Sequence, residues 1–317
     1  MSLLQTDAGQ HQRHHQPGLN RAYHGCGLPT IRAGLPWEKL RFNKIMKTNH
    51  QSKMGTALIT GASSGIGAIY ADRFAKRGYD LILVARDQKK LDILGTRLIA
   101  DTGVKTQSLQ ADLTSKSDLA RVEQRLRNDG QITLLLNNAG MSVEGSLVGG
   151  DLDQLELMIR LNVVATTRLA GAAAAAFVAR GHGTIINIAS VLALAPELFN
   201  GAYSGTKAYL LNLSQALHQE IGSKGVRIQA VLPGATRTAI WEKSGTDVSK
   251  LPAGILMEVD EMVDAALAGL DLGEIVTIPS LPKIADWQAF NAARLALGPN
   301  LSKDHAADRY KTVTLKP

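Results

Sequence analysis

The segment YSGTK, residues 203–207, places a tyrosine and a lysine four positions apart. In a helix this spacing brings Tyr203 and Lys207 onto one face, where an ammonium can approach a phenol. A free tyrosine has a pKa of about 10, too high for proton exchange near neutral pH, and an adjacent cation lowers that pKa. The pair is therefore either a surface pair on a helix or a tuned acid and base. The elements around it must decide between the two.

A glycine-rich turn lies near the start of the periodic part of the sequence. TGASSGIG, residues 60–67, follows an apolar run at 56–60, and its glycines have the spacing G-x-x-x-G-x-G. Glycine lets the backbone approach a pyrophosphate closely, and a helix that begins here adds partial positive charge. The pattern predicts a dinucleotide-binding turn. The contacts are expected from Gly61, Ser63, Ser64, Gly65, Ile66 and Gly67.

The end of the second apolar run should distinguish the two nicotinamide dinucleotides. A carboxylate about 20 residues after the glycines would bind the ribose hydroxyls of NAD. Here Arg86 stands 19 residues after Gly67, and a guanidinium suits the 2′-phosphate of NADP. Asp87 is adjacent, so NADP is preferred and NAD is possible.

Asp112 follows the third apolar run and has two interpretations. Its carboxylate can accept a hydrogen bond from the adenine amino group, with Leu113 beside it. Alternatively, Asp112 is the N-cap of a helix that Leu113 enters.

Seven short apolar runs alternate with segments long enough for helices. Several runs are continuously apolar, which is typical of strands buried on both faces of a parallel sheet. The sequence predicts an α/β, doubly wound Rossmann-type fold: a single domain of about seven mostly parallel strands with helices on both faces. The expected strands are 56–60, 80–86, 105–111, 132–138, 183–190, 227–233 and 274–279.

The first 53 residues differ from the rest of the chain. They hold eight Lys and Arg against two acidic residues, whereas the other 264 residues carry 27 basic and 26 acidic side chains. The nearly neutral body gives no electrostatic argument for nucleic acid, and no apolar run approaches a membrane span. We predict residues 1–53 to be a disordered leader or a wrongly assigned start, with Met46 or Met54 as the true start, and 54–317 to be the domain.

The basic, acid-poor leader also leaves organellar targeting open. Cys26 is the single cysteine, which rules out an intramolecular disulfide and a cysteine metal site, and we expect no metal. This cysteine usage fits a reducing compartment, and a cytoplasmic location is expected.

Taken in order, the motifs resemble the short-chain dehydrogenase/reductase family, in its compact single-domain branch. They cover about residues 54–280. The resemblance implies an oxidoreductase that transfers a hydride between NADP(H) and a carbonyl or secondary alcohol. The motifs are TGASSGIG, ADL (111–113), NNAG (137–140), Asn162 in RLNVVAT, Ser190 in NIAS, YSGTK and PGATRT (233–238).

The resemblance implies four catalytic residues. Tyr203 matches the general acid/base, and Lys207 matches the cation that lowers its pKa. Ser190 matches the serine that orients the substrate carbonyl, and Asn162 matches a helix asparagine that holds a water for proton relay. Thr236 competes with Thr238 for the last cofactor contact. The implied cofactor contacts are Asn138, Ala139, Gly140, Tyr203, Lys207, Pro233, Gly234 and Thr238.

The segments after residue 238 give fewer signals about the substrate. Residues 239–256 are expected to form a substrate lid, in which Trp241 and Leu251 either cover an apolar substrate or pack on the body. The C-terminal tail is expected to be helical and to pack on the core or on another subunit of a homodimer or homotetramer. A 3-oxoacyl thioester reductase and a nonenzymatic NADPH sensor are the alternative functions. The sequence names no particular substrate and no reaction direction.

Overall fold

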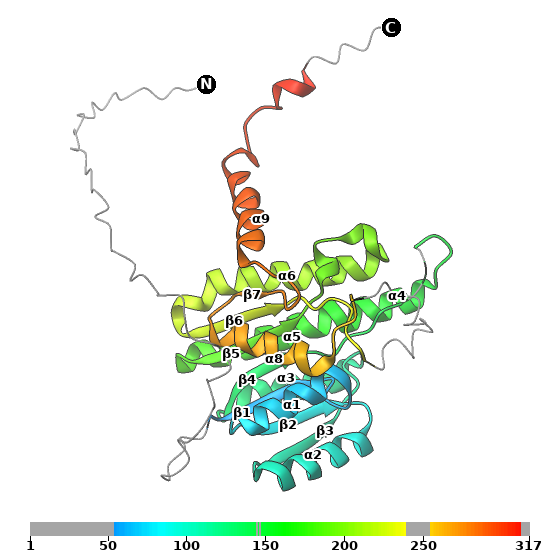
Figure 1. Ribbon diagram of the computed structural model, residues 1–317, viewed down its shortest axis with the longest axis vertical. Coiled ribbons are helices and arrows are strands. Elements are labelled where there is room, and N and C mark those ends of the chain that lie inside the picture. The colour runs from blue at the N-terminus through cyan, green and yellow to red at the C-terminus, as the bar shows by residue number, and fades with distance from the viewer. Residues whose placement is uncertain (1–53, 144, 146, 239–253, 312–317) are drawn as a thin grey trace, which may run out of the picture. The chain divides into compact units, whose positions relative to one another are not determined.

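Seven parallel strands form one sheet in the order β3-β2-β1-β4-β5-β6-β7 (Figure 1). The computed structural model describes residues 54–143, 145, 147–238 and 254–311. The predicted parallel, doubly wound sheet is confirmed, and each strand begins and ends close to its predicted bounds. The strands are β1 (Thr56–Thr60), β2 (Asp80–Ala85), β3 (Thr106–Gln110), β4 (Ile132–Asn137), β5 (Gly183–Ile188), β6 (Val226–Val231) and β7 (Val276–Thr277).

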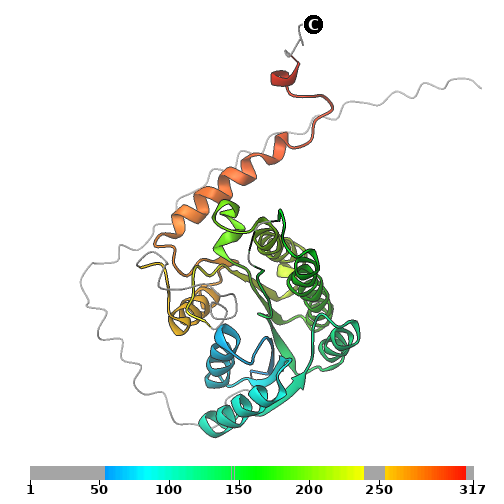
Figure 2. The ribbon, with the colours of Figure 1, turned by 90° about the vertical axis from the view of Figure 1, so that its right-hand side faces the viewer.

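Helices cover both faces of this sheet, as Figure 2 shows from the side. One face packs against α1 (Gly65–Lys76), α2 (Gln88–Thr102) and α8 (Val259–Asp271). The other face packs against α3 (Lys116–Asn128), α5 (Thr166–Arg180) and α6 (Gly201–Ile221). Two further helices are α4 (Leu152–Ile159) and α9 (Ile284–Ala296).

The central strands are apolar on both sides because both sides are buried. In β1, Ala57 and Ile59 belong to the core under α1 and α8, while Leu58 belongs to the core under α3 and α5. All three side chains are fully buried. This double burial explains why the strand reads as a continuous apolar run in the sequence.

The start of α3 excludes one of the two interpretations of Asp112, that of a helix N-cap. Ser115 is the N-cap of this helix and its hydroxyl accepts from the Asp118 amide. Asp112 therefore does not cap α3: its carboxylate accepts from the amide and hydroxyl of Thr114, at 2.9 and 2.7 Å. Leu113 is a buried core residue before the helix, and does not enter it. The Ser-x-x-Asp pattern at 115–118 is the better cap signal.

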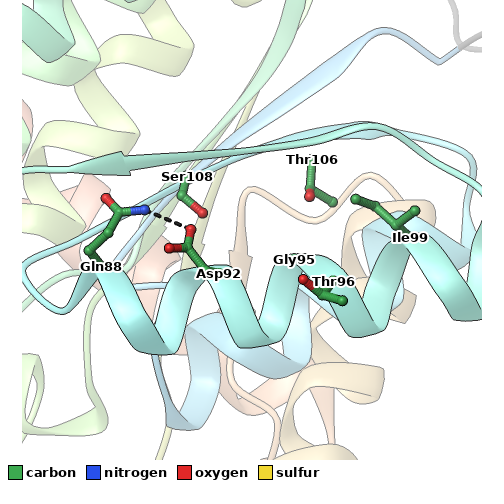
Figure 3. Close-up of a pocket in the computed structure, with 7 residues that line it drawn as sticks. All are labelled: Gln88, Asp92, Gly95, Thr96, Ile99, Thr106 and Ser108. Atoms are coloured by element: carbon green, nitrogen blue, oxygen red, sulfur yellow. Dashed lines mark hydrogen bonds between the residues drawn. The ribbon is translucent and has the colours of Figure 1, made fainter.

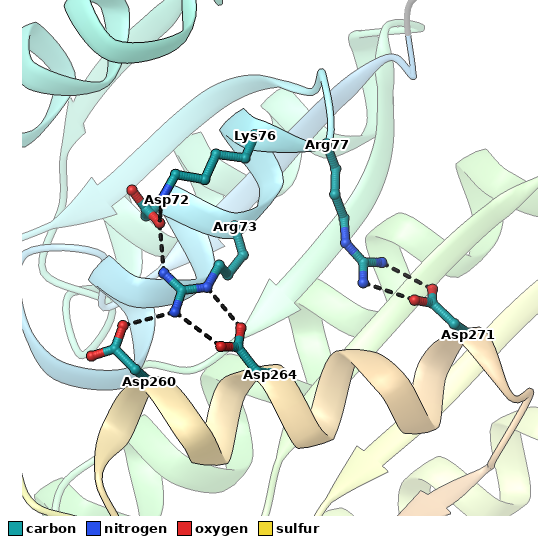
Figure 4. Close-up of polar contacts among 7 residues, drawn as sticks. All are labelled: Asp72, Arg73, Lys76, Arg77, Asp260, Asp264 and Asp271. Carbon is teal, nitrogen blue, oxygen red and sulfur yellow. Dashed lines mark hydrogen bonds and ion pairs between the residues drawn. The ribbon is translucent and has the colours of Figure 1, made fainter. Parts of the chain in front are cut away.

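An ion-pair cluster fastens α1 to α8 (Figure 4). The Arg73 guanidinium donates to Asp264 at 2.7 Å and to Asp260 at 2.8 Å. Arg77 makes two bonds of 2.9 and 2.8 Å to Asp271. These pairs hold the element that follows the predicted lid against the helix that begins at the glycine turn.

Three predictions concern the segments around the sheet, and two of them fall outside the described residues. The leader at 1–53 and most of the predicted lid, including Trp241 and Leu251, lie outside the described residues. The helical tail is present as α9. Trp287 packs against the cluster that contains β6 and β7 residues, whereas no residue of α9 is fully buried.

One helical stretch in the described part of the chain, Leu152–Arg180, has the length and composition of a membrane-crossing helix. Half of its most apolar window is buried within the fold. Its alanines in α5 pack beneath the sheet with Phe177. The stretch therefore has the environment of a core helix.

Candidate active site

Tyr203 lies in the first turn of α6, three residues after the N-cap residue Asn200. Burial raises the pKa of Tyr203 to about 12, and an interaction with the Ser190 hydroxyl has a smaller, opposite effect. The phenol therefore carries its proton at neutral pH and can act as an acid.

Lys207 lies one turn further along α6 and is almost completely buried. Its Nζ donates to the carbonyl of Ile188 at 2.9 Å and lies 5.6 Å from the centroid of the Tyr203 ring. Burial lowers the pKa of Lys207 to about 8. The structure brings the pair together on one helix face as predicted. Their electrostatics differ from the prediction, because burial of Tyr203 and its bond with Ser190 set the phenol's pKa here.

Ser190 follows β5 and begins a short 3₁₀ turn. Its Oγ accepts from the Leu192 amide at 3.2 Å and donates to the carbonyl of Pro233 at 3.5 Å. The hydroxyl is therefore fixed between the ends of β5 and β6, beside the Tyr203 phenol. A substrate carbonyl at this point meets two hydroxyl groups.

Asn162 lies in a π-helical turn, Arg160–Ala165, that joins α4 to α5. Its Oδ1 accepts from the Met141 amide at 2.9 Å, and its Nδ2 donates to the Met141 carbonyl at 2.8 Å and to Thr206 at 3.1 Å. All its side-chain groups thus bind protein, so the side chain fastens the exit of β4 to α6. The π-helical turn itself is of a kind that occurs frequently at functional sites.

The glycine turn has the backbone conformation that its spacing predicts. Gly61 and Gly65 have φ of 66° and 54°, in the left-handed region that favours glycine. A Cβ on Gly61 would lie 2.7 Å from Nδ2 of Asn138. Ser64 is the N-cap of α1 but makes no side-chain capping bond, and the first turn contains no acidic residue. The backbone amides of this turn and of the first turn of α1 therefore suit a pyrophosphate, because the N-terminus of a helix attracts negative charge.

The other residues of the glycine turn are placed around this cradle. Ser63 and Ile66 are partly exposed, and Ser64 is exposed, so the serine hydroxyls can reach a phosphate. Gly67 is buried against the carbonyl of Gly61, where a side chain would not fit.

The end of β4 packs directly on this turn. Nδ2 of Asn138 donates to the carbonyls of Thr60 and Gly61, at 2.9 and 3.2 Å. The amides of Asn138 and Ala139 both donate to Oγ1 of Thr60, at 3.0 Å each. The Asn138 side chain therefore shapes the turn. A Cβ on Gly140 would lie 3.6 Å from Nζ of Lys207, which shows how closely this backbone approaches Lys207.

The two threonines after β6 have different surroundings. Thr238 lies beside the glycine turn, since a Cβ on Gly65 would meet its side chain at 3.4 Å. Thr236 is buried and its hydroxyl donates to the carbonyl of Gly234 at 3.1 Å. Only Thr238 faces the first turn of α1, so the geometry favours it over Thr236. Buried Pro233 and partly buried Gly234 form the backbone that turns away from Ser190.

The ends of β2 and β3 form an open hollow of about 370 Å³. Arg86 is exposed, and its carbonyl accepts from Gln110 at 2.9 Å. Asp87, which left the cofactor prediction open, is the N-cap of α2 and accepts from the Lys90 amide at 3.0 Å. The hollow is lined by Arg86, Gln110, Asp112, Asp118 and Arg121.

A second hollow, of about 390 Å³, lies between α2 and the edge strand β3 (Figure 3). Its lining includes Gln88, Asp92 and Thr106. None of the predicted site residues lines it, and Gln88 is hydrogen-bonded to Asp92 at 2.7 Å. This hollow is a polar groove that is separate from the predicted active site.

Two residues that the sequence analysis did not single out adjoin the tyrosine. Phe199 places its ring edge-on to Tyr203, with centroids 5.5 Å apart. Asn200 caps α6 by accepting from the amides of Ala202 and Tyr203, at 2.8 and 3.2 Å. An asparagine directly before the helix was a readable cap signal, but the phenylalanine contact depends on tertiary structure.

Comparison with known proteins agrees with this geometry. The short chain dehydrogenase family pattern matches residues 55–249. A very-long-chain 3-oxoacyl-CoA reductase from Bos taurus is 35% identical over 216 residues, which span 63% of this chain and 69% of that protein.

Two solved structures are more similar. A short-chain dehydrogenase from Sphingobium yanoikuyae in complex with NADPH is 53% identical, covers 81% of this chain and 100% of its own, and has a TM-score of 0.79. A bulky-bulky ketone specific alcohol dehydrogenase from Comamonas testosteroni is 48% identical, covers 82% of this chain and 99% of its own, and has a TM-score of 0.76. The chain belongs to the short-chain dehydrogenase family.

Proposed function

We propose that this protein is an NADPH-dependent oxidoreductase that interconverts bulky, largely apolar ketones and their secondary alcohols, with Tyr203 as the general acid and base. The observation that supports this most strongly is the joint placement of Tyr203, Ser190 and Lys207. The Tyr203 phenol interacts with the Ser190 hydroxyl, and the Nζ of Lys207 lies 5.6 Å from the centroid of the Tyr203 ring. Ser190 follows β5 and the glycine turn follows β1, so both lie at the carboxyl edge of the parallel sheet.

Each catalytic side chain has a defined task in ketone reduction. When bound, NADPH supplies the hydride for the carbonyl carbon. Ser190 donates a hydrogen bond to the carbonyl oxygen, where negative charge develops. Tyr203 gives that oxygen its phenolic proton, which the phenol carries at neutral pH.

Lys207 and Asn162 support this proton transfer. The ammonium of Lys207 stabilises the phenolate that forms, and at a pKa of about 8 it can itself exchange a proton near neutrality. Asn162 holds Met141 and Thr206, and so fixes the strand exit against the helix that carries Tyr203. A relay water at the π-helical turn would return the proton from solvent.

Apolar side chains on two loops support a bulky substrate. Leu198 and Phe199 are 70% and 42% exposed just before α6, and Leu147 is 65% exposed before α4. The two loops meet where Asn200 binds the backbone of Val143 and Gly145. The Comamonas testosteroni neighbour is named for bulky-bulky ketones, which agrees with an apolar wall beside Tyr203.

Arg86 supports the preference for NADP. Its guanidinium is exposed at the hollow, while Asp87 is occupied as a helix cap and does not compete for the ribose. The Sphingobium yanoikuyae neighbour is in complex with NADPH. The proposed contacts with the cofactor are those of the glycine turn and Arg86, Asp112, Leu113, Asn138, Ala139, Gly140, Pro233, Gly234 and Thr238.

A 3-oxoacyl thioester is the second candidate substrate, because the Bos taurus relative is a very-long-chain 3-oxoacyl-CoA reductase. Its reacting group is also a ketone, so the same three side chains would serve. A nonenzymatic NADPH sensor has less support, since it requires neither the acid nor the hydroxyl that orients a carbonyl.

NADPH oxidation should be followed with alkyl aryl ketones, a small aliphatic ketone and a 3-oxoacyl thioester. We expect the highest kcat/KM for the aryl ketones. A higher kcat/KM for the thioester would show that the second candidate, a 3-oxoacyl thioester, is the better substrate. Tight NADPH binding without turnover of any substrate would favour the sensor.

We also propose that the protein is a cytoplasmic homo-oligomer. The near-neutral body and the buried face of α5 support a location in solution. The apolar side chains Phe290, Leu295 and Leu297 on and after α9 are about half exposed, at 49%, 58% and 57%, and would be covered by a second subunit. Sedimentation at micromolar concentration and cell fractionation test these two statements separately.

A further inference from the structure

Asn200 makes hydrogen bonds with every polar atom of its side chain, and these bonds connect two elements. Its Oδ1 accepts from the amides of Ala202 and Tyr203. Its Nδ2 donates to the carbonyl of Gly145 at 2.7 Å and to that of Val143 at 3.4 Å. We propose that Asn200 is a positioning residue that fixes the loop between β4 and α4 against the helix turn that carries Tyr203.

The chemistry of the amide group explains why asparagine stands here. An N-cap needs an acceptor, and Asn, Asp and Ser provide one about equally well. The two backbone carbonyls need a donor at the same position, which aspartate lacks and which serine is too short to supply. Asparagine carries both on one rigid planar group.

The loop that Asn200 holds is already fixed at its start. Asn162 binds both the amide and the carbonyl of Met141. Asn200 adds two further attachments at Val143 and Gly145, before the exposed Leu147. Gly145 has φ of 92°, a conformation that favours glycine, so this bend depends on its residue type.

This inference rests on the proposed ketone chemistry for its kinetic consequence. Without the bonds from Asn200, the apolar side chains of the loop lose their fixed distance from Tyr203. A bulky ketone then binds less tightly, because the apolar side chains of the loop must become ordered when it binds. A small ketone that does not reach the loop is affected much less.

Three substitutions separate the cap from the loop attachment. Asn200→Ser and Asn200→Asp keep the capping acceptor but lose the donor, while Asn200→Ala loses both. We expect the Ser variant to keep the Tm of the wild type and to lose about 10-fold in kcat/KM for an alkyl aryl ketone, mainly through KM. The Asp variant should show the same loss, and the Ala variant should in addition lower Tm by about 2–4 °C.

Gly145→Ala perturbs the same contact from the other side. We expect it to raise the KM for the aryl ketone, and we expect the double variant Asn200→Ser/Gly145→Ala to be little worse than the worse single variant. Additive losses would mean that the two residues act independently, which would contradict the proposal.

Hydrogen exchange gives a readout that does not depend on turnover. Peptides that contain Val143 and Gly145 should exchange several-fold faster in the Ser variant than in the wild type, with α3 peptides unchanged. Unchanged exchange, or a Ser variant with the KM of the wild type for the aryl ketone, would overturn the role of Asn200. If the wild type reduces no ketone, the proposed function fails, and the exchange result still decides the role of Asn200.

Discussion

The two ends of the candidate site are built differently. At the Tyr203 end, Ser190, Lys207 and Asn162 are buried. Hydrogen bonds connect them to groups on β5 and α6 and on the loops that follow β4 and β6. At the proposed adenosine end, Arg86 is exposed and stands beside polar and charged neighbours on an open hollow.

From this difference we expect the buried end to determine turnover and the exposed end to determine how tightly the cofactor binds. A buried group in a connected set cannot be replaced without leaving a partner unsatisfied, so its loss should affect turnover strongly. An exposed guanidinium competes with water and salt, so its loss should weaken binding by a graded amount. The predictions that follow test this separation.

The largest effect is expected for Tyr203→Phe. The variant keeps the ring against Phe199 but loses the proton, so kcat for ketone reduction should fall by about 10³-fold. The Kd for NADPH, measured by fluorescence titration, should remain within a few-fold of wild type. A kcat close to that of the wild type would remove Tyr203 from the chemistry.

A smaller effect on binding is expected for Arg86→Ala. Loss of a charge-assisted bond to the 2′-phosphate should raise the KM for NADPH by about 10- to 100-fold, with the KM for NADH nearly unchanged. Lys90→Ala is the matched control, because it removes an exposed positive charge nearby that does not line the hollow. Equal changes in both variants would indicate a general charge effect.

The burial of Lys207 should be visible in stability. Its folded pKa of about 8 lies below its unfolded value of 10.5. The unfolded chain therefore binds more protons between these values, and the free energy of unfolding should rise by about 2 kcal/mol from pH 8 to 10 on account of this residue.

Denaturant titrations of the wild type and of Lys207→Met over this range measure that contribution. The variant should have a flatter pH dependence than the wild type. Above about pH 10 the comparison is less direct, because the raised pKa values of Tyr70 and Tyr203 make stability fall with pH. Equal slopes below pH 10 would show that the lysine is not desolvated in the folded protein.

The smallest effect is expected for Phe199→Ala. Loss of the edge-on ring contact should lower kcat/KM for alkyl aryl ketones about 5-fold, in line with the energies of aromatic pairs. Leu198→Ala is the neighbouring control and should change kcat/KM less, since among the described ring–ring contacts only that of Phe199 involves the Tyr203 ring. A larger loss in the Leu198 variant would place the substrate on the other side of this turn.

The fold could be predicted well from the sequence because its signals are local. The seven apolar runs correspond to the seven strands, and the glycine spacing marks the turn where Gly61 and Gly65 take positive φ. The start of α3 was harder to predict, because Asp112 and Ser115 both have side chains that can cap a helix. The structure selects Ser115, whose spacing to Asp118 completes the cap.

The sequence could predict that Tyr203 and Lys207 lie close together, but it could not predict their electrostatics. The motifs place Tyr203 and Lys207 on one helix face, yet burial depends on how the sheet and helices pack around them. That burial raises one pKa and lowers the other. The contacts of Phe199 and Asn200 also depend on tertiary structure, since Asn200 binds residues more than 50 positions away.

The most direct test of the central claim is isotope transfer. NADPH carrying deuterium at the transferable position should be incubated with an alkyl aryl ketone and the enzyme, and the alcohol should be analysed by mass spectrometry. The proposed mechanism predicts one deuterium on the carbinol carbon with the wild type and almost no alcohol with Tyr203→Phe. Alcohol without deuterium, or NADPH oxidation without alcohol, would contradict hydride transfer to a carbonyl at this site.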